Sequence, residues 1–237
     1  MTRWPEQVLS VRGLMSRPHV LVDGAGAVIV DTGLPVDEAR IRRTLAAAGR
    51  GPRDVRAILL THGHLDHAGS AAALRAWTGA PVYAHPLDAL HLAAAFPYHG
   101  LTRVCAAAEA AGRFVFGYTP PPIDVPIADG DELPCWGGLR VVHLPGHTVG
   151  HCGFYSARHE VLFSGDLWVR FLLRTQVSPR IFTDEPRDVW PSLQKVRALG
   201  PRWIIPGHYD QADGVRLRQR FEELCAEIDR RKGGAVV

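Results

Sequence analysis

The feature that most constrains this chain is the segment AILLTHGHLDHAGS, residues 57–70. It starts as an apolar run with the character of a buried strand and continues into a cluster of imidazole and carboxylate groups. Burying such groups at the end of an apolar strand is costly unless something binds them. The segment therefore predicts a metal site, with His62, His64, Asp66 and His67 as candidate ligands.

The spacing within this segment separates the candidate ligands into two pairs. Residues two apart in an extended chain point the same way, so His62 and His64 can reach one metal from the same side. Asp66 and His67 fall where the chain turns toward a predicted helix, and they can point at a neighbouring position.

Three further segments place ligand-type side chains at turns that follow strand-like runs. VVHLPGHTVGH offers His147 and His151, VLFSGD offers Asp166, and WIIPGH offers His208. Strand ends above a packed core are a common way to build a site from segments that are distant in sequence. The alternative interpretation is a set of solvated surface histidines.

Composition bounds the class of protein. The chain has 237 residues, of which 46% are hydrophobic and 22% charged, and this is typical of a globular α/β domain. The net charge is +3 and the arginines are scattered, so we expect no nucleic-acid partner. No apolar run approaches the ~20 residues that span a bilayer, and the N-terminus lacks the build of a signal peptide. We therefore expect a cytoplasmic protein without a membrane partner.

The cysteines do not form a pattern that is typical of a disulfide framework or of a thiolate zinc site. They are widely spaced and no CxxC pair occurs: Cys105, Cys135, Cys152 and Cys225.

Periodicity predicts one domain over residues 1–237, built from two β-rich parts with helices outside. Helical patterns cover residues 36–49, 68–79, 188–200 and 214–231, and a helical insertion is expected at 86–122. The segment 167–182 is predicted to be a loop. Strands are expected at 8–13, 19–33, 55–62, 81–86, 124–133, 138–147, 151–156, 160–166 and 203–208.

Taken in order, these motifs resemble the metallo-β-lactamase superfamily. They are VDTG (30–33), HGHLDH (62–67), GHTVGH (146–151), SGD (164–166) and PGH (206–208), and the resemblance extends from about residue 8 to 215. It implies an α/β fold, a four-layer αββα sandwich with a metal site at one edge of the two sheets.

The resemblance also implies a role for each candidate ligand. His62, His64 and His147 would hold the first metal ion, and Asp66, His67 and His208 the second, with Asp166 bridging the two ions. Imidazole and carboxylate ligands without thiolate suit Zn²⁺, and iron and manganese also fit. Asp31 and His151 would contact the ligands without binding the metal themselves. The alternative role for Asp31 is that of a turn residue, and the alternative role for His151 is that of a packing residue.

Such a metal pair predicts hydrolysis by a metal-bridging hydroxide. Two divalent ions lower the pKa of bound water, and the positive charge left on the site stabilises a developing oxyanion. Asp66 and Asp166 are the predicted catalytic residues. Asp66 or a metal-bound water would supply the proton for the leaving group.

The resemblance favours the glyoxalase II and acyl-lactonase branch, and hence a small ester, thioester or lactone as the substrate. Asp166 argues against antibiotic hydrolysis, because the members with that activity typically carry Cys or Ser at this position. Two features depart from the favoured branch. Lactonases often place Tyr at the position of Val169, and glyoxalase II enzymes usually have a longer C-terminal helical region than this chain. A mononuclear iron persulfide dioxygenase and a phosphodiesterase remain alternatives, and a non-catalytic binding protein is disfavoured because every expected ligand position is filled.

The substrate pocket is predicted between the insertion 86–122 and the segment that follows Asp166. Trp168 and Phe171 would wall it, and Arg170 would be available for an anionic group. The alternative is a plain core or the interface of a homodimer. The expected partner is a small-molecule substrate.

Overall fold

The computed structural model describes residues 5, 7–95, 98, 100–171, 174–208 and 214–233. Its first sheet has six strands in the order β1-β2-β3-β4-β5-β6. The first three strands pair antiparallel, and β3 to β6 pair parallel. The bounds are β1 Val8–Ser10, β2 His19–Asp23, β3 Gly26–Val30, β4 Val55–Leu59, β5 Val82–Ala84 and β6 Val125–Pro126.

The second sheet has five strands in the order β13-β10-β9-β8-β7. Its pairs are antiparallel, except that β10 and β13 run parallel. The bounds are β7 Glu132–Leu133, β8 Leu139–His143, β9 Cys152–Ser156, β10 Val161–Gly165 and β13 Trp203–Pro206.

Both faces of strand β4 are buried, which explains why its sequence is a nearly continuous apolar run. Ala57 and Leu59 join the core cluster that also contains residues of the second sheet, such as Phe154. Ile58 points the other way and packs in a second core with helix residues such as Leu45. The alternation along one strand thus builds both the space between the sheets and the space under the outer helices.

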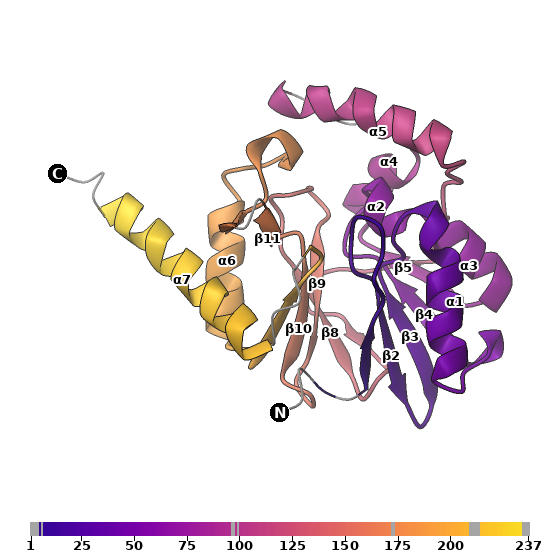
Figure 1. Cartoon of the computed structure of the whole chain (residues 1–237). Helices are drawn as coiled ribbons and strands as arrows, with labels where there is room; N and C mark the ends of the chain where they lie inside the picture. The colour runs from indigo at the N-terminus through magenta and orange to yellow at the C-terminus, as the bar shows by residue number, and fades with distance from the viewer. Residues whose placement is uncertain are drawn as a thin grey trace.

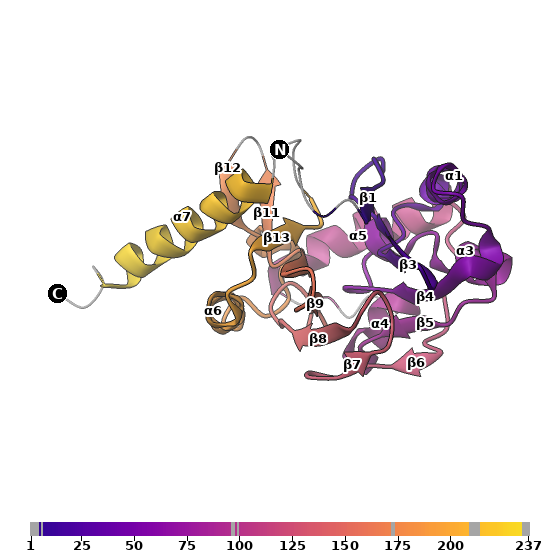
Figure 2. The same cartoon turned by 90° about the horizontal axis from the view of Figure 1, so that it is seen from below.

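Helices cover the outer faces of the two sheets, as Figures 1 and 2 show. On the side of the first sheet lie α1 (Glu38–Ala47) and α3 (Ala71–Thr78), and on the side of the second lie α6 (Val189–Leu199) and α7 (Gly214–Gly233). This arrangement confirms the predicted αββα sandwich. Among the described helices, none combines the length and apolar character needed to cross a membrane.

Short helical elements occupy most of the segment that was expected to be an insertion. They are η3 (Pro86–Asp88), α4 (Ala89–Leu92), η4 (Gly100–Thr102) and α5 (Arg103–Val115). Helix α5 contacts α2 (Leu65–Ala68) and lies above the sheet edge on which α2 sits (Figure 1). The remaining 3-10 turns are η1 (Pro35–Asp37), η2 (Pro52–Asp54) and η5 (Arg180–Phe182).

The segment 167–182 differs from the prediction of a loop. Strands β11 (Trp168–Phe171) and β12 (Arg174–Val177) pair antiparallel and form a separate two-stranded sheet. This hairpin rests on helix α7, where the Trp168 ring lies 6.0 Å from the ring of Phe221. Aromatic and aliphatic residues in this segment therefore bury side chains in the core, which stabilises a strand pair where the local sequence carries no clear signal.

Candidate metal centre

All the predicted metal ligands converge at one edge of the sandwich. Strand β4 leads into His62 and His64, and helix α2 carries Asp66 and His67. The second sheet supplies three ligands from the β8–β9 connection and from the ends of β10 and β13: His147, Asp166 and His208. Because β3 and β4 are parallel to each other, and β10 is parallel to β13, their carboxyl ends meet at this edge.

Three histidine nitrogens form the first candidate position. His64 Nδ1 lies 2.9 Å from His147 Nε2, which in turn lies 3.2 Å from His62 Nε2. Two ligands at tetrahedral zinc distances would be about 3.3 Å apart, so this spacing fits a shared metal ion.

The second candidate position joins Asp66, His67 and His208. His208 Nε2 lies 3.0 Å from Asp66 Oδ2 and 3.2 Å from His67 Nε2. Asp166 stands between the two positions, because its Oδ2 lies 3.6 Å from His147 Nε2 and 3.2 Å from His208 Nε2. The geometry is that of two adjacent cation sites with a carboxylate between them.

The residues present fit a pair of divalent metal ions. Asp166 Oδ1 is buried and accepts no hydrogen bond from the part of the chain that the structure describes. A buried carboxylate oxygen of this kind is costly unless a cation or donor reaches it. The donor set of imidazoles and carboxylates suits zinc, and it is also compatible with iron and manganese.

One carboxylate orients ligands of both positions. Asp31 Oδ2 lies 2.9 Å from His67 Nδ1, and both Asp31 oxygens accept from the Thr61 hydroxyl at 2.9–3.0 Å. Thr61 Oγ1 is 3.0 Å from His62 Nδ1. In the neutral ring that metal binding requires, a proton on each Nδ1 leaves Nε2 of His62 and of His67 with a lone pair toward the metal position.

His151 contacts the backbone of Asp166 and is not itself within either ligand group. Its Nε2 accepts from the Asp166 backbone N–H at 2.9 Å, and its Nδ1 donates to the Leu144 carbonyl at 3.0 Å. A side chain at Gly165 would collide with this ring, since a Cβ there would lie 2.5 Å from His151 Nε2. A Cβ at Gly207 would lie 2.4 Å from Asp166 Oδ1, so the glycine of SGD makes room for His151 and the glycine of PGH makes room for the ligand Asp166.

Asp88 accepts hydrogen bonds from two loops that carry ligands, and no sequence motif predicted this role. Its carboxylate accepts from the backbone N–H groups of Gly63 and Gly150 and from the Thr148 hydroxyl, each at 2.8 Å. Gly63 separates His62 from His64, and Thr148 follows His147. Asp88 therefore fixes ligands of the first position relative to one another.

Glu109 and Arg113 of helix α5 hold the same loop from above. Glu109 accepts from the Leu65 backbone N–H at 3.0 Å, and Arg113 donates to the Gly63 carbonyl at 3.1 Å. Their side chains pair at 2.5 Å and are 11% and 5% exposed. No sequence pattern indicated Glu109, Arg113 or Asp88, because their partners lie far away along the chain. Of the supporting residues that were missed, Thr61 alone could have been found from the sequence, because it directly precedes His62.

Burial and neighbouring charges shift the pKa values of the histidines in opposite directions at the two metal positions. Burial lowers the pKa of His62 and of His147 well below the usual histidine value, and it lowers the pKa of His64 to about 3. These rings are therefore neutral and ready to bind a cation. Burial also opposes the charge on His208, but the carboxylates of Asp166 and Asp66 outweigh it and raise the pKa of His208 to about 10.

Two cavities adjoin at the ligands, with volumes of about 310 and 280 Å³. Both are lined by His64 and Asp66. The second also has Val169 and Arg170 in its wall, so Arg170 lies where a pocket residue was predicted.

The prediction for Trp168 was wrong. This side chain is fully buried in the core, because the β11–β12 hairpin turns it toward helix α7 and Phe221. Its neighbour Val169 lines the cavity instead. The side chain of Phe171 falls outside the described part of the chain, and its pocket role stays a prediction.

An αββα sandwich with histidine and aspartate ligands at one edge defines a class of metal-dependent enzymes. The chain belongs to the Metallo-beta-lactamase superfamily, whose family model matches residues 12–208. The match confirms the superfamily that the motifs predicted.

Relatives and solved structures agree with this family. A hydroxyacylglutathione hydrolase of Cereibacter sphaeroides (strain ATCC 17029 / ATH 2.4.9) is 33% identical over 167 residues, which are 70% of this chain and 52% of the relative. The chain thus spans about half the length of that relative. A metallo-beta-lactamase family protein of Thermus thermophilus superposes with a TM-score of 0.73 at 27% identity, over 94% of this chain and 79% of that one.

The protein TTHA1623, solved in a di-iron-bound form, superposes with a TM-score of 0.65 at 30% identity. The match covers 89% of this chain and 96% of that one.

Proposed function

We propose that the protein is a dinuclear metal-dependent hydrolase that cleaves a small ester, thioester or lactone. The observation that carries the proposal is the position of Asp166 between two groups of ligands that open into a common pair of cavities. We propose Zn²⁺ as the metal, with iron as the first alternative because TTHA1623 was solved with two irons.

The bound metal pair would supply Lewis acidity and lower the pKa of water toward neutrality. The protein's own part is to hold the ligand nitrogens in the right tautomer, through Asp31 and Thr61. In the reaction, a water oxygen adds to the carbonyl carbon, the bond from that carbon to sulfur or oxygen breaks, and the leaving group takes up a proton.

Asp66 is the group that we assign to move this proton. Its carboxylate lines both cavities and lies 3.0 Å from His208, so it faces the space where a leaving group would depart. In the metal-free site, burial works against the charged form, but His67 and His208 lower the pKa of Asp66 below its usual value. Asp66 is thus ionised, so its carboxylate can accept a hydrogen bond from the attacking water and orient the proton that the leaving group takes up.

A panel of substrates tests the proposal. The relative named hydroxyacylglutathione hydrolase makes acyl-glutathione thioesters the first compounds to measure, followed by lactones, simple esters and phosphodiesters. We expect the zinc-loaded protein to hydrolyse a carboxylic ester or thioester, and Asp166→Ala to abolish the activity and lower the metal content. Oxygen uptake with glutathione persulfide in an iron-loaded protein that hydrolyses none of the panel would contradict the proposal.

A further inference from the structure

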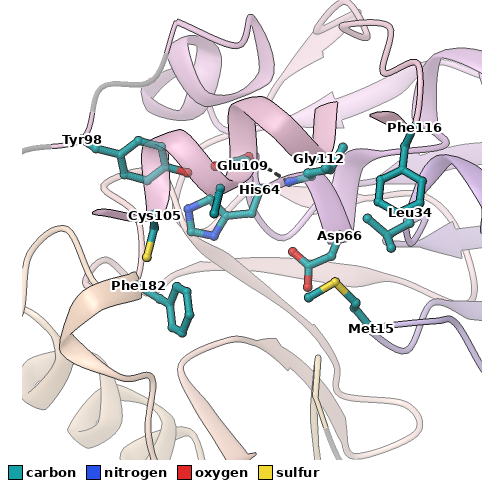
Figure 3. A pocket seen from close by; sticks show the side chains of 12 residues that line it. Met15, Leu34, His64, Asp66, Tyr98, Cys105, Glu109, Gly112, Phe116 and Phe182 are labelled. Carbon is teal, nitrogen blue, oxygen red and sulfur yellow. Dashed lines mark hydrogen bonds between the residues drawn. The ribbon is translucent and has the colours of Figure 1, made fainter. Parts of the chain in front are cut away.

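The cavity of about 310 Å³ runs between helix α5 and the ligand loop. Figure 3 shows Leu34 and Phe116 together at one end of it, with His64 and Asp66 in the middle. At the other end lie Cys105 and Phe182, so a substrate whose reacting carbon lies at the metal ligands has room beside it for a further group that extends under helix α5 past Cys105 toward Phe182.

The wall of this cavity is apolar away from the metal ligands. Leu34 and Leu65 are buried, and Phe116 and Phe182 add aromatic surface. The remaining acidic group, Glu109, is engaged by Arg113 and by the Leu65 backbone N–H, so its charge is matched within the protein. Such a wall favours an aliphatic group over a charged one, because burial of unpaired charge is costly.

One face of helix α5 forms the roof and leaves space for a ligand. Cys105, Ala108, Glu109 and Gly112 line the cavity, and their spacing of three and four residues places them on one side of the helix. Ala108 carries only a methyl group and leaves space beside it, whereas Gly112 lets the helix approach Leu65, since a Cβ there would lie 3.0 Å from Leu65 Cδ2. Ala107 is exposed and lies off this face.

We propose that this cavity, which we name the α5 cavity, binds the aliphatic acyl group of the substrate, so that the enzyme prefers medium-length acyl esters or thioesters to acetyl ones. The inference rests on the proposed hydrolase function. The leaving group would occupy the second cavity, where Arg170 and Ser178 provide polar groups. The bond that breaks then lies between the two cavities, at the ligands that both share.

Acyl-chain dependence tests the inference in the zinc-loaded protein. Thioesters with one common thiol and acetyl, butanoyl, hexanoyl or octanoyl groups are compared by kcat/KM. We expect kcat/KM to rise along the series by up to about fourfold per methylene, the factor that corresponds to ~0.8 kcal/mol for each buried CH₂.

Two variants of helix α5 make a matched pair. Ala108→Phe places a ring under the helix, and we expect the ratio of octanoyl to acetyl kcat/KM to fall by about tenfold or more. Ala107→Phe adds the same ring one position away, off the lining face, and should keep the wild-type ratio. A flat chain-length profile, or an equal loss in both variants, would overturn the inference.

A binding measurement separates this inference from the hydrolase proposal. Cys105 lines the α5 cavity, whereas Cys135 lies elsewhere and is also half-buried, so the two thiols report inside and outside the cavity. We expect octanoate, but not acetate, to slow alkylation of Cys105 while alkylation of Cys135 is unchanged. Protection without any hydrolysis would refute the reaction and keep the binding site, whereas hydrolysis without selective protection would refute the α5 cavity as the acyl site.

Discussion

At the scale of single residues, Asp31 controls the ligands of both metal positions. It has a left-handed backbone with φ of 56°, a conformation that Asp and Asn tolerate better than most side chains. From there its carboxylate reaches His67 directly and His62 through Thr61. One buried group thus sets the tautomer of a ligand in each half of the site.

Asp31→Asn should therefore weaken metal binding without unfolding the protein. The amide keeps the shape and the tolerated backbone conformation, but it loses the acceptor that favours protonation of His67 at Nδ1. We expect zinc affinity to fall about 10- to 100-fold in a competition titration with a coloured chelator. Asp23→Asn, in the β2–β3 hairpin, is the control and should change the affinity little. An Asp31→Asn affinity equal to that of the control would show that Asp31 does not orient the ligands.

The charge on His208 predicts proton release when metal binds. Although burial lowers it, the pKa of His208 is raised to about 10 by Asp166 and Asp66, so this ring is protonated near pH 8 in the metal-free protein. Zinc requires the neutral ring and must displace that proton. Calorimetry in two buffers of different ionisation enthalpy should show at least one proton fewer released by His208→Gln than by the wild type, because the pKa of His67 in the same position is also raised. Equal release would mean that His208 is already neutral before the metal arrives.

The ligands themselves were predictable from the sequence, whereas the residues behind them were not. Each ligand follows an apolar run and sits in a short motif, so local patterns are sufficient to find it. Asp88 carries no such pattern, because its partners Gly63 and Gly150 come close only in the folded chain. The position of Trp168 was mistaken for a similar reason: nothing within 167–182 indicates that α7 provides the surface on which it packs.

At the scale of elements, helix α5 is tied to the ligand loop by a buried ion pair. Glu109 and Arg113 each bond one backbone group of the loop that carries His64. The helix therefore has two tasks, since the same face also forms the roof of the α5 cavity.

Glu109→Gln should destabilise the protein strongly. The substitution leaves the buried Arg113 without its counter-charge, and loss of one partner of a buried pair costs about 3–5 kcal/mol. Urea unfolding of the metal-free protein measures this cost without a contribution from metal affinity. The control is Arg75→Gln, which breaks the pair of the 43% exposed Arg75 with Asp124 and should change the free energy of unfolding only slightly, because water screens that pair. If both variants lose the same free energy, the α5 pair does not brace the loop.

At the scale of the whole molecule, the metal centre joins the two sheets. His62, His64, Asp66 and His67 follow strand β4 of the first sheet, and His147, Asp166 and His208 belong to the second sheet. Each metal position draws ligands from both sheets, so a bound ion links the two halves of the sandwich at this edge. Without metal, this edge holds carboxylates and protonated imidazoles in one buried space.

Removal of metal should therefore loosen the sandwich at this edge and lower its thermal stability. A ligand present at about a thousand times its Kd stabilises the folded state by about 4 kcal/mol, which for a chain of this size corresponds to a change in Tm on the order of 10 °C. We expect chelation to lower Tm by that order and to speed amide exchange in the ligand loops of both sheets, while the β2–β3 hairpin at the opposite edge keeps its protection. His208→Gln, which lacks one ligand of the second position, should respond less to chelation than the wild type does. Faster exchange confined to the loop after β4 would mean that the metal serves only the first sheet, and that the two halves of the sandwich are held together by the apolar core alone.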